Sequence, residues 1–220
     1  MAIDRHPQEE TLVRYAAGTL DPSLAYVVDA HLDDCPRCRR RLGLALETGG
    51  QLLDGLAQPT LSGSQVDAAW PTLLGRLETP DLAEAAGRPS ASGVSPAIPV
   101  EQLRERLQGK LRWGRLAPGI EQCVIHRSAS GGWIRLFRSQ PGSGVPMHTH
   151  SAEEFSTVLQ GSYVDENGHF GVGDFCELNH EDSHHPVVDS DVPCIALIAV
   201  SGTIRFRNPL IQSLARFAAL

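Results

Sequence analysis

Hydrophobic residues recur at helical spacing along the first third of the chain. The clearest helix start is at Asp21 and Pro22, because aspartate is a favoured N-cap and proline is favoured in the first helical position. Apolar side chains then repeat three or four positions apart. Between residue 8 and about residue 78, the pattern predicts four short helices: QEETLVRYAAGTL, DPSLAYVVDAHL, PRCRRRLGLALETGGQLLDGL and SQVDAAWPTLLGRLE. Four short helices build only a small core, which would gain from a structural metal ion.

The pattern changes to short β-prone runs from about residue 111. Glycine, proline, asparagine or aspartate separates most of the runs, and Asn167-Gly168 is a strong hairpin signal. The runs are EQCVIHRS, GWIRLFRS, EFSTVLQGSYV, DFCELN, HPVVD, CIALIAV and TIRFRN. Many short strands at this spacing predict a β-sandwich or barrel. The predicted fold class is therefore α + β in two domains, with a small helical bundle before a β-barrel.

Residues 79–100 lie between these two regions and differ from both. They are rich in proline, alanine, glycine and serine and hold little that could be buried. This composition is typical of a linker. The sequence thus predicts a helical domain over residues 1–78, a flexible linker over residues 79–100 and a β domain over residues 101–220.

Composition and charge narrow the function classes. The 220 residues include 41% hydrophobic residues, and the formal net charge is -7. An acidic chain is a poor candidate for binding nucleic acid and suits a partner with a basic surface better. No apolar run reaches the length of a membrane span, and the start MAIDRHPQEETLVRY has no apolar core of a secretory signal. We therefore expect a cytoplasmic location, where the five cysteines stay reduced.

The stretch HLDDCPRC holds a first group of possible metal ligands. If a helix ends near Cys35, then His31 lies one turn before it on the same face. Pro36 can begin the next helix and place Cys38 in its first turn, where free backbone N–H groups stabilise thiolates. Zinc takes four nitrogen or sulfur ligands in a tetrahedron. His6, just before the first helix, is the candidate for the fourth.

Two other interpretations of this cysteine pair are open. A Cys-x-x-Cys pair can be a redox centre, but such pairs usually follow a strand in a βαβ setting, and no strand is predicted before this one. The cysteines could also be small buried side chains, although Asp33, Asp34 and Arg37 make the neighbourhood polar. His6 alone would be a weak signal, because a lone histidine is commonly a surface or capping residue. Zinc is the favoured interpretation.

A second group of possible ligands lies in the β region. His148 and His150 alternate along a strand-like run, so both face the same side, and Glu154 has the same parity. A third histidine could come from NHEDSHHPV, where the candidates are His184, His185 and, less favoured, His180. Three imidazoles and one carboxylate suit zinc, iron, manganese or nickel.

The helical region resembles a known family. A histidine followed by HxxxCxxC within short helices, in LVRYAAGTLDPSLAYVVDAHLDDCPRCRRRLG, is similar to the zinc-binding anti-sigma domain. The resemblance implies a zinc ion held by His6, His31, Cys35 and Cys38. It also implies a partner, an extracytoplasmic-function sigma factor, whose surfaces for core RNA polymerase are blocked by this domain.

The β region resembles the cupin family. Gly142, His148-x-His150, Glu154 and Gly161 stand at the spacing of the first cupin motif. A looser second motif has Gly171, Gly173 and Asp174 with a histidine ten residues later, but it lacks the usual proline and a clear asparagine. By position, the resemblance implies His184 as the last ligand of a divalent metal, with zinc the first choice. His126, His169 and His185 are then expected to be ordinary surface or strand histidines.

Taken together, the two halves resemble the ChrR-type anti-sigma factors. The resemblance implies a transcription regulator and not an enzyme, with a cupin needed for the response to oxidative stress, such as singlet oxygen. Met147, Cys176 and Cys194 are oxidation candidates in such a cupin. One alternative is a metal-dependent, dioxygenase-like cupin enzyme with a helical docking domain. Another is direct DNA binding, but its only support is the run Arg39–Arg41, and the net charge opposes it.

Overall fold

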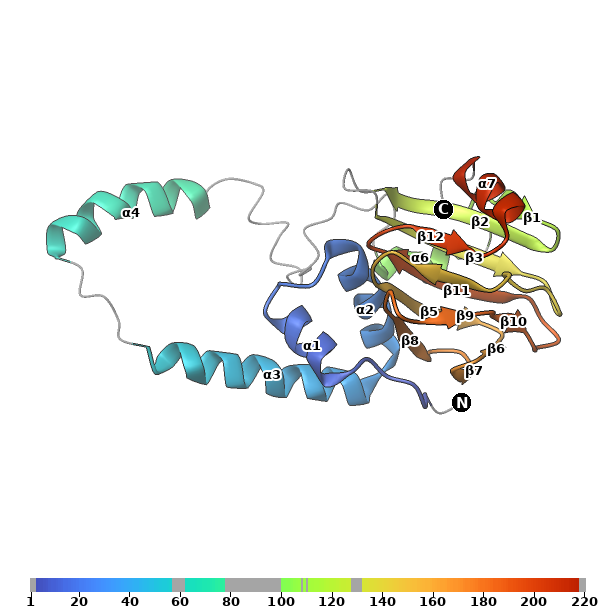
Figure 1. Ribbon diagram of the computed structural model, residues 1–220. Coiled ribbons are helices and arrows are strands. Elements are labelled where there is room, and N and C mark those ends of the chain that lie inside the picture. The colour runs from blue at the N-terminus through green and yellow to red at the C-terminus, as the bar shows by residue number, and fades with distance from the viewer. Residues whose placement is uncertain are drawn as a thin grey trace.

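Helices precede a β-barrel in the computed structural model, which describes residues 3–56, 62–77, 100–107, 109, 111–127 and 132–217 (Figure 1). The helices are α1 (Glu9–Ala16), α2 (Pro22–Asp34), α3 (Pro36–Asp54), α4 (Gly63–Leu77), α6 (Val100–Leu107) and α7 (Pro209–Phe217). The predicted linker, residues 79–100, lies outside the described residues except for Val100, which begins α6. Across the described residues, no helix is long and apolar enough to cross a membrane.

The corner between α2 and α3 forms where the sequence predicts it. Asp21 caps α2, its side chain accepting a hydrogen bond from the Ser23 N–H at 2.8 Å. Cys35 ends α2 and caps α3 at once, because its N–H donates to the His31 carbonyl while its sulfur accepts from the Cys38 N–H. An extended backbone at this one residue therefore turns the chain between two helices.

The β region forms a barrel of antiparallel strands. One sheet has the order β1-β2-β3-β11-β5-β8, and two three-stranded sheets have the orders β10-β6-β7 and β12-β4-β9. The strands are β1 (Gly114–Ala117), β2 (Ile120–Arg127), β3 (Trp133–Ser139), β4 (His148–His150), β5 (Glu154–Gln160), β6 (Tyr163–Asp165), β7 (Gly168–Phe170), β8 (Phe175–Leu178), β9 (Ser183–His184), β10 (Val187–Val188), β11 (Cys194–Val200) and β12 (Ile204–Phe206). The predicted α + β fold class, with helices before a cupin barrel, is confirmed.

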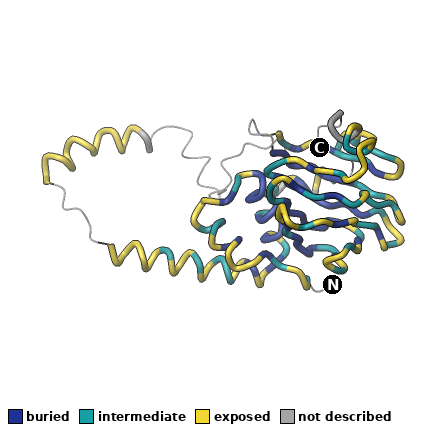
Figure 2. The backbone as a smooth tube through the Cα atoms, viewed as in Figure 1, coloured by how far each residue is buried: buried dark blue, intermediate teal, exposed yellow. Residues whose placement is uncertain are grey.

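The central strands β3, β5 and β11 of the six-stranded sheet are buried on both faces. Alternate side chains of β11 point into the barrel, while Ile195, Leu197 and Ala199 point outward into a core that they share with α2. On α2, Leu24 and Val27 are completely buried in the same core. Figure 2 shows this burial where α2 meets the strands, and it shows α4 and the far half of α3 exposed. The helical region and the barrel therefore share one hydrophobic core.

Leu197 offers a direct test of this shared core. Replacing Leu197 with alanine removes a completely buried side chain between the sheet and the helices. We expect the free energy of unfolding to fall by about 2–5 kcal/mol, as for other large-to-small core substitutions. Chemical denaturation followed by circular dichroism measures this. Val192→Ala, at an exposed position, is the control and should leave the free energy nearly unchanged; a Leu197→Ala protein as stable as this control would contradict the shared core.

Candidate metal centres

Two groups of side chains that could each hold a metal ion converge among the described residues. The first joins His6, His31, Cys35 and Cys38, and the second joins His148, His150, Glu154 and His184. In each group, one ligand atom per residue lies within 4.8 Å of all the others. These are the eight residues that the sequence predicts.

The first group, called here the N-terminal centre, draws on three parts of the helical region. His31 lies on α2, Cys35 at the corner and Cys38 in the first turn of α3, while His6 comes from the extended segment before α1. The Nδ1 atom of His6 is 3.4 Å from both sulfur atoms, and the Nε2 atom of His31 is 3.4 Å from the Cys38 sulfur. Zinc bonds to sulfur and nitrogen place neighbouring ligand atoms about 3.4–3.7 Å apart in a tetrahedron. The spacing therefore fits zinc.

The protonation of the N-terminal centre also fits a cation. His31 Nδ1 lies 2.9 Å from the Gly173 carbonyl, which can only accept, so the lone pair is on Nε2 and faces Cys38. Burial lowers the pKa of His31 to about 4, so this imidazole is neutral at pH 7. Burial, with the Cys35 thiol beside it, raises the pKa of Cys38 to about 11. A zinc ion would displace that thiol proton and accept the lone pair of His31.

The second group, called here the cupin centre, is assembled by short strands of the barrel. His148 and His150 lie on β4, which pairs with β9 so that His148 stands opposite His184. Glu154 begins β5. Its carboxylate oxygens lie 3.0 Å from His150 Nε2 and 3.7 Å from His184 Nε2. All four residues are buried, so their polar atoms face one another and not water.

Hydrogen bonds outside the cupin centre orient two of its imidazoles. His148 Nδ1 lies 3.0 Å from the Pro146 carbonyl, and His184 Nδ1 lies 2.9 Å from the Asp165 carboxylate. Both partners are acceptors, so each ring carries a proton on Nδ1 and turns its Nε2 atom toward the cluster. The two Nε2 atoms face each other at 2.9 Å. At this distance one Nε2 atom donates a hydrogen bond to the lone pair of the other, and a cation bound by both lone pairs would take the place of the shared proton.

The charge at the cupin centre, and its buried polar atoms that lack hydrogen-bond partners, also favour a bound cation. Burial raises the pKa of Glu154, but the neighbouring histidines, His150 foremost, outweigh burial and bring it to about 2, so this carboxylate is ionised. Burial lowers the pKa of His148 to about 4. Within the described structure, the His150 Nδ1 atom is buried without a hydrogen-bond partner, and the contact of 3.0 Å between His150 Nε2 and Glu154 Oε2 lacks hydrogen-bond geometry. One carboxylate and three imidazoles fit a divalent metal ion, whose identity the donor set leaves open.

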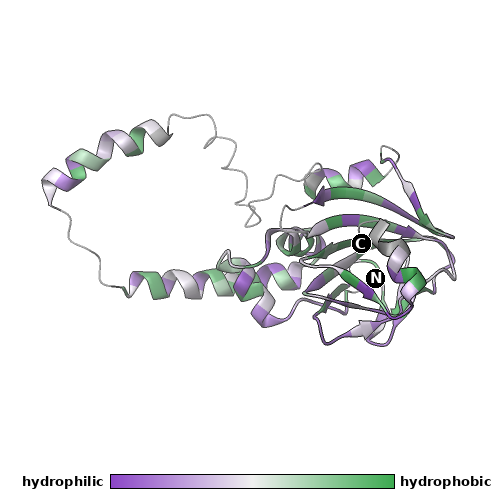
Figure 3. Ribbon diagram, turned by 45° about the horizontal axis from the view of Figure 1, so that its top comes forward, coloured by the Kyte–Doolittle hydropathy of each residue, from purple (hydrophilic) through white to green (hydrophobic). Residues whose placement is uncertain are grey.

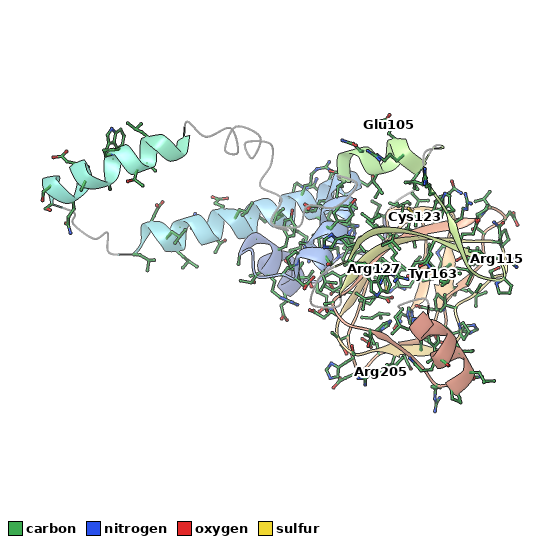
Figure 4. All side chains as sticks on the ribbon, turned by 90° about the horizontal axis from the view of Figure 1, so that it is seen from above. Glu105, Arg115, Cys123, Arg127, Tyr163 and Arg205 are labelled. Atoms are coloured by element: carbon green, nitrogen blue, oxygen red, sulfur yellow. The ribbon has the colours of Figure 1, made fainter. Side chains whose placement is uncertain are left out.

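A cavity of about 90 Å³ opens onto the cupin centre. Its wall includes His148, Glu154 and His184, so a small molecule in the cavity could reach a metal held there. Most of the remaining wall is apolar or aromatic and includes Trp133, Phe137, Tyr163 and Phe206. Figure 4 shows Tyr163 among the strands of the barrel.

The structure also decides between the histidines that the sequence left open. His184 is buried in the cupin centre, whereas His180 and His185 are exposed. His126 is half-buried on β2 and His169 is exposed on β7, and neither belongs to a cluster. Sequence reasoning missed the partners that orient the ligands, Asp165 and the Gly173 carbonyl. No spacing rule could identify them, because they lie 19 and 142 residues from the histidines that they bind.

Comparison with known proteins relates both regions of the chain to one architecture. A zinc-finger family model matches residues 9–39, and the model of the ChrR cupin-like domain matches residues 107–201. The anti-sigma-E factor ChrR of Cereibacter sphaeroides is 33% identical over 208 residues, which is 94% of each chain. A chain in the crystal structure of Rhodobacter sphaeroides SigE in complex with the anti-sigma ChrR is similar with a TM-score of 0.71 and 30% identity, covering 90% of this chain and 99% of that chain.

Replacing Cys38 with serine tests the N-terminal centre. This change removes one of two thiolates, and the protein should lose one equivalent of zinc while the cupin centre keeps its metal. Metal analysis of the purified protein by mass spectrometry measures this. Cys123→Ser is the control, because Cys123 lies outside both clusters. A Cys38→Ser protein with the same metal content as this control would show that the cluster does not hold zinc.

Replacing Asp165 with asparagine tests the cupin centre. The change removes the charged acceptor that orients His184, and the metal affinity should fall about 10- to 100-fold, as for outer partners of other metal ligands. Competition with a chelator measures the affinity, in a Cys38→Ser background that removes the N-terminal centre. Asp189→Asn is the control, because Asp189 contacts Ser162 and His169 and no residue of the cluster. Equal affinities in the two proteins would contradict the assignment.

Proposed function

The chain belongs to the family of ChrR-type anti-sigma factors, and from this premise we propose that its N-terminal helices bind an extracytoplasmic-function sigma factor and hold it inactive. We propose further that zinc at the N-terminal centre shapes the binding surface, and that a divalent metal, zinc by preference, occupies the cupin centre. The chain would act in the cytoplasm, where sigma factors meet core RNA polymerase. We propose that the chain is divided into a helical domain over residues 1–78, a linker over residues 79–100 and a cupin domain over residues 101–220.

The apolar side chains that α3 and α4 leave exposed carry this proposal. Helix α3 is described throughout its 19 residues, and only Cys38 is buried. Figure 3 shows hydrophobic positions along both helices. The exposed apolar residues of the two helices, which together are called here the helical apolar surface, are Leu44, Leu46, Leu52, Leu53 and Leu56 on and just after α3, and Val66, Trp70, Leu73 and Leu74 on α4. An apolar surface of this kind on amphipathic helices is typical of a protein-binding site.

Charge supports a protein partner in preference to DNA. The net charge of -7 suits a partner whose own surface is basic enough to bind DNA. Two arginines of the run that could suggest DNA contacts are engaged within the fold. Arg39 donates to the carbonyls of Leu32 and Asp33 at 2.6 and 2.9 Å. Arg41 donates to the Glu9 carboxylate at 2.9 Å and to the Pro7 carbonyl at 3.2 Å.

The N-terminal centre would have a structural role. With two cysteines and two histidines, zinc would have four protein ligands and no open position for a substrate. The ligands come from the segment before α1, from α2 and from α3, so the bound ion would fix the angle at which α3 leaves the corner. That angle sets where the apolar side chains of α3 point, and it would therefore set their fit to the sigma factor.

The cupin would be needed for the response to oxidative stress, such as singlet oxygen. Its cavity would admit a small oxidant to the metal ligands. Thiolate oxidation is the less favoured route, because burial raises the pKa of Cys194 to about 12 and raises that of Cys176 further, so both stay protonated. Met147, beside His148, is half-buried. We therefore favour a chemical event at the cupin centre itself over a cysteine switch.

A metal-dependent cupin enzyme is the second candidate, and the cavity beside the cupin centre favours it. Against it stands the scarcity of general acids and bases. Apart from the proposed metal ligands, the ionisable residues on the described wall of the cavity are Tyr163 and Cys194. Burial raises the pKa of both groups far above 7. We therefore propose a regulator in preference to an enzyme.

Replacing Leu53 with glutamate tests the helical apolar surface. Leu53 is 65% exposed, so the change should not disturb the fold, but it places a charge in the proposed interface. We expect the affinity for an extracytoplasmic-function sigma factor from the same genome to fall at least about tenfold, as for a residue near the centre of an interface. Calorimetric titration measures this. Leu210→Glu, at an exposed position of α7, is the control, and equal affinities of the two variants would place the interface elsewhere.

A further inference from the structure

Among the described residues, the turn before β8 brings the cupin barrel against His31 of the N-terminal centre. We propose that this turn, residues 171–175, orients two ligands of the zinc site without binding zinc itself. Asp174 is the residue of the turn that positions the segment carrying His6. By this account, the zinc affinity of the N-terminal centre depends on the barrel. The proposal rests on zinc binding at this centre and not on sigma binding, so the two can fail separately.

Asp174 holds the chain directly before the zinc ligand His6. One carboxylate oxygen accepts hydrogen bonds from the N–H groups of Asp4 and Arg5, at 2.8 and 2.9 Å. The other oxygen accepts from the Gly171 N–H at 2.8 Å and so fixes the turn itself. The side chain is buried, so water does not replace these bonds. A carboxylate that accepts three N–H hydrogen bonds is a strong anchor.

Further contacts hold the same segment against the turn. The Phe175 N–H donates to the Arg5 carbonyl at 3.1 Å, so the segment runs along the start of β8. The Arg5 guanidinium lies over the ring of Phe170, 5.3 Å from its centroid. The side chain of Ile3 lies so close to Gly173 that a Cβ there would be 2.7 Å from it. Gly173 also has a φ of +88°, which favours glycine, so close approach and backbone geometry both exclude a side chain.

The turn orients a second ligand, His31. Its Gly173 carbonyl is the acceptor that fixes the tautomer of this imidazole, at 2.9 Å. The ring of Phe175 contacts the same imidazole edge-on, with the centroids 5.4 Å apart. Both imidazoles of the N-terminal centre are therefore positioned by the barrel, while both thiols come from the corner between α2 and α3. An isolated helical domain would lack half of this support.

The contact continues along the strands that lead to the cupin centre. The Glu177 carboxylate on β8 accepts from the Thr11 hydroxyl at 2.8 Å and from the Gln8 N–H at 3.2 Å. Glu153 holds Arg14 through two hydrogen bonds of 2.6 and 2.9 Å. Glu153 directly precedes Glu154, a proposed metal ligand of the cupin centre. A displacement at the start of β5 would thus reach α1 through Arg14.

Two pairs of full-length variants test the proposal with cobalt as the probe. Arg5→Pro removes the backbone N–H group that donates a hydrogen bond to Asp174, whereas Arg5→Ala keeps this N–H group and loses only the side chain. In Asp174→Asn the amide must turn its NH₂ group toward one of the N–H donors that the carboxylate binds. Asp189→Asn, elsewhere on the barrel, is the matched control. Thiolate-to-cobalt absorption reports the N-terminal centre alone, because the cupin centre has no cysteine.

Competition between cobalt and a chelator gives the affinity of the N-terminal centre. We expect it to fall about 10- to 100-fold in both Arg5→Pro and Asp174→Asn, as for other outer-shell changes, and to stay at the parental value in Arg5→Ala and Asp189→Asn. Parental affinity in Arg5→Pro would overturn the proposal, even if Asp174→Asn binds weakly, because the weakness would then come from damage to the barrel. If the cobalt affinity fell as far in Arg5→Ala as in Arg5→Pro, the hydrogen bond from the Arg5 N–H to Asp174 would not be the cause, and its proposed role would be overturned. Sigma binding has no part in this readout.

Discussion

Burial of the outer face of the barrel sheet beneath α2 is the interaction on which the rest of the structure depends. A six-stranded sheet with apolar side chains on both faces needs a cover on each, and the closed barrel covers only the inner one. Helix α2 covers the outer face near β5 and β11. The same helix carries His31 and ends at Cys35, so the packing that completes the core also places the N-terminal centre at the edge of the barrel.

The two centres follow one physical rule although their ligands differ. In each, an acceptor outside the cluster accepts a hydrogen bond from the Nδ1–H group of an imidazole and so directs the Nε2 atom inward. The acceptor is the Gly173 carbonyl for His31, the Asp165 carboxylate for His184 and the Pro146 carbonyl for His148. Burial keeps water from competing for the same nitrogen atoms. The centres differ in access, since a cavity reaches the cupin centre, while the N-terminal centre has four protein ligands available and suits a structural ion.

Much of this fold and both clusters could be predicted from local sequence patterns. Helix starts at Asp21 and strand alternation around His148 depend on neighbouring residues, and the ligand spacings reflect helical and strand periodicity. The run CIALIAV predicted a strand, and its unbroken apolarity is consistent with burial on both faces, but nothing in it identified α2 as the cover. The contacts of Asp174 with Asp4 and Arg5 span about 170 residues, and such pairings depend on the tertiary fold. The leucines of α3 fitted a helix, and their exposure could be learned only from the structure.

We propose that a zinc-stabilised helical region on a cupin barrel presents an apolar surface to a sigma factor. Native mass spectrometry of the full chain, co-expressed with an extracytoplasmic-function sigma factor from the same genome, tests it most directly, because one spectrum reports the partner and the bound metals. The account predicts a complex in which each copy of the chain carries two metal ions, one in each centre. A folded, metal-loaded chain that leaves the sigma factor unbound would contradict it.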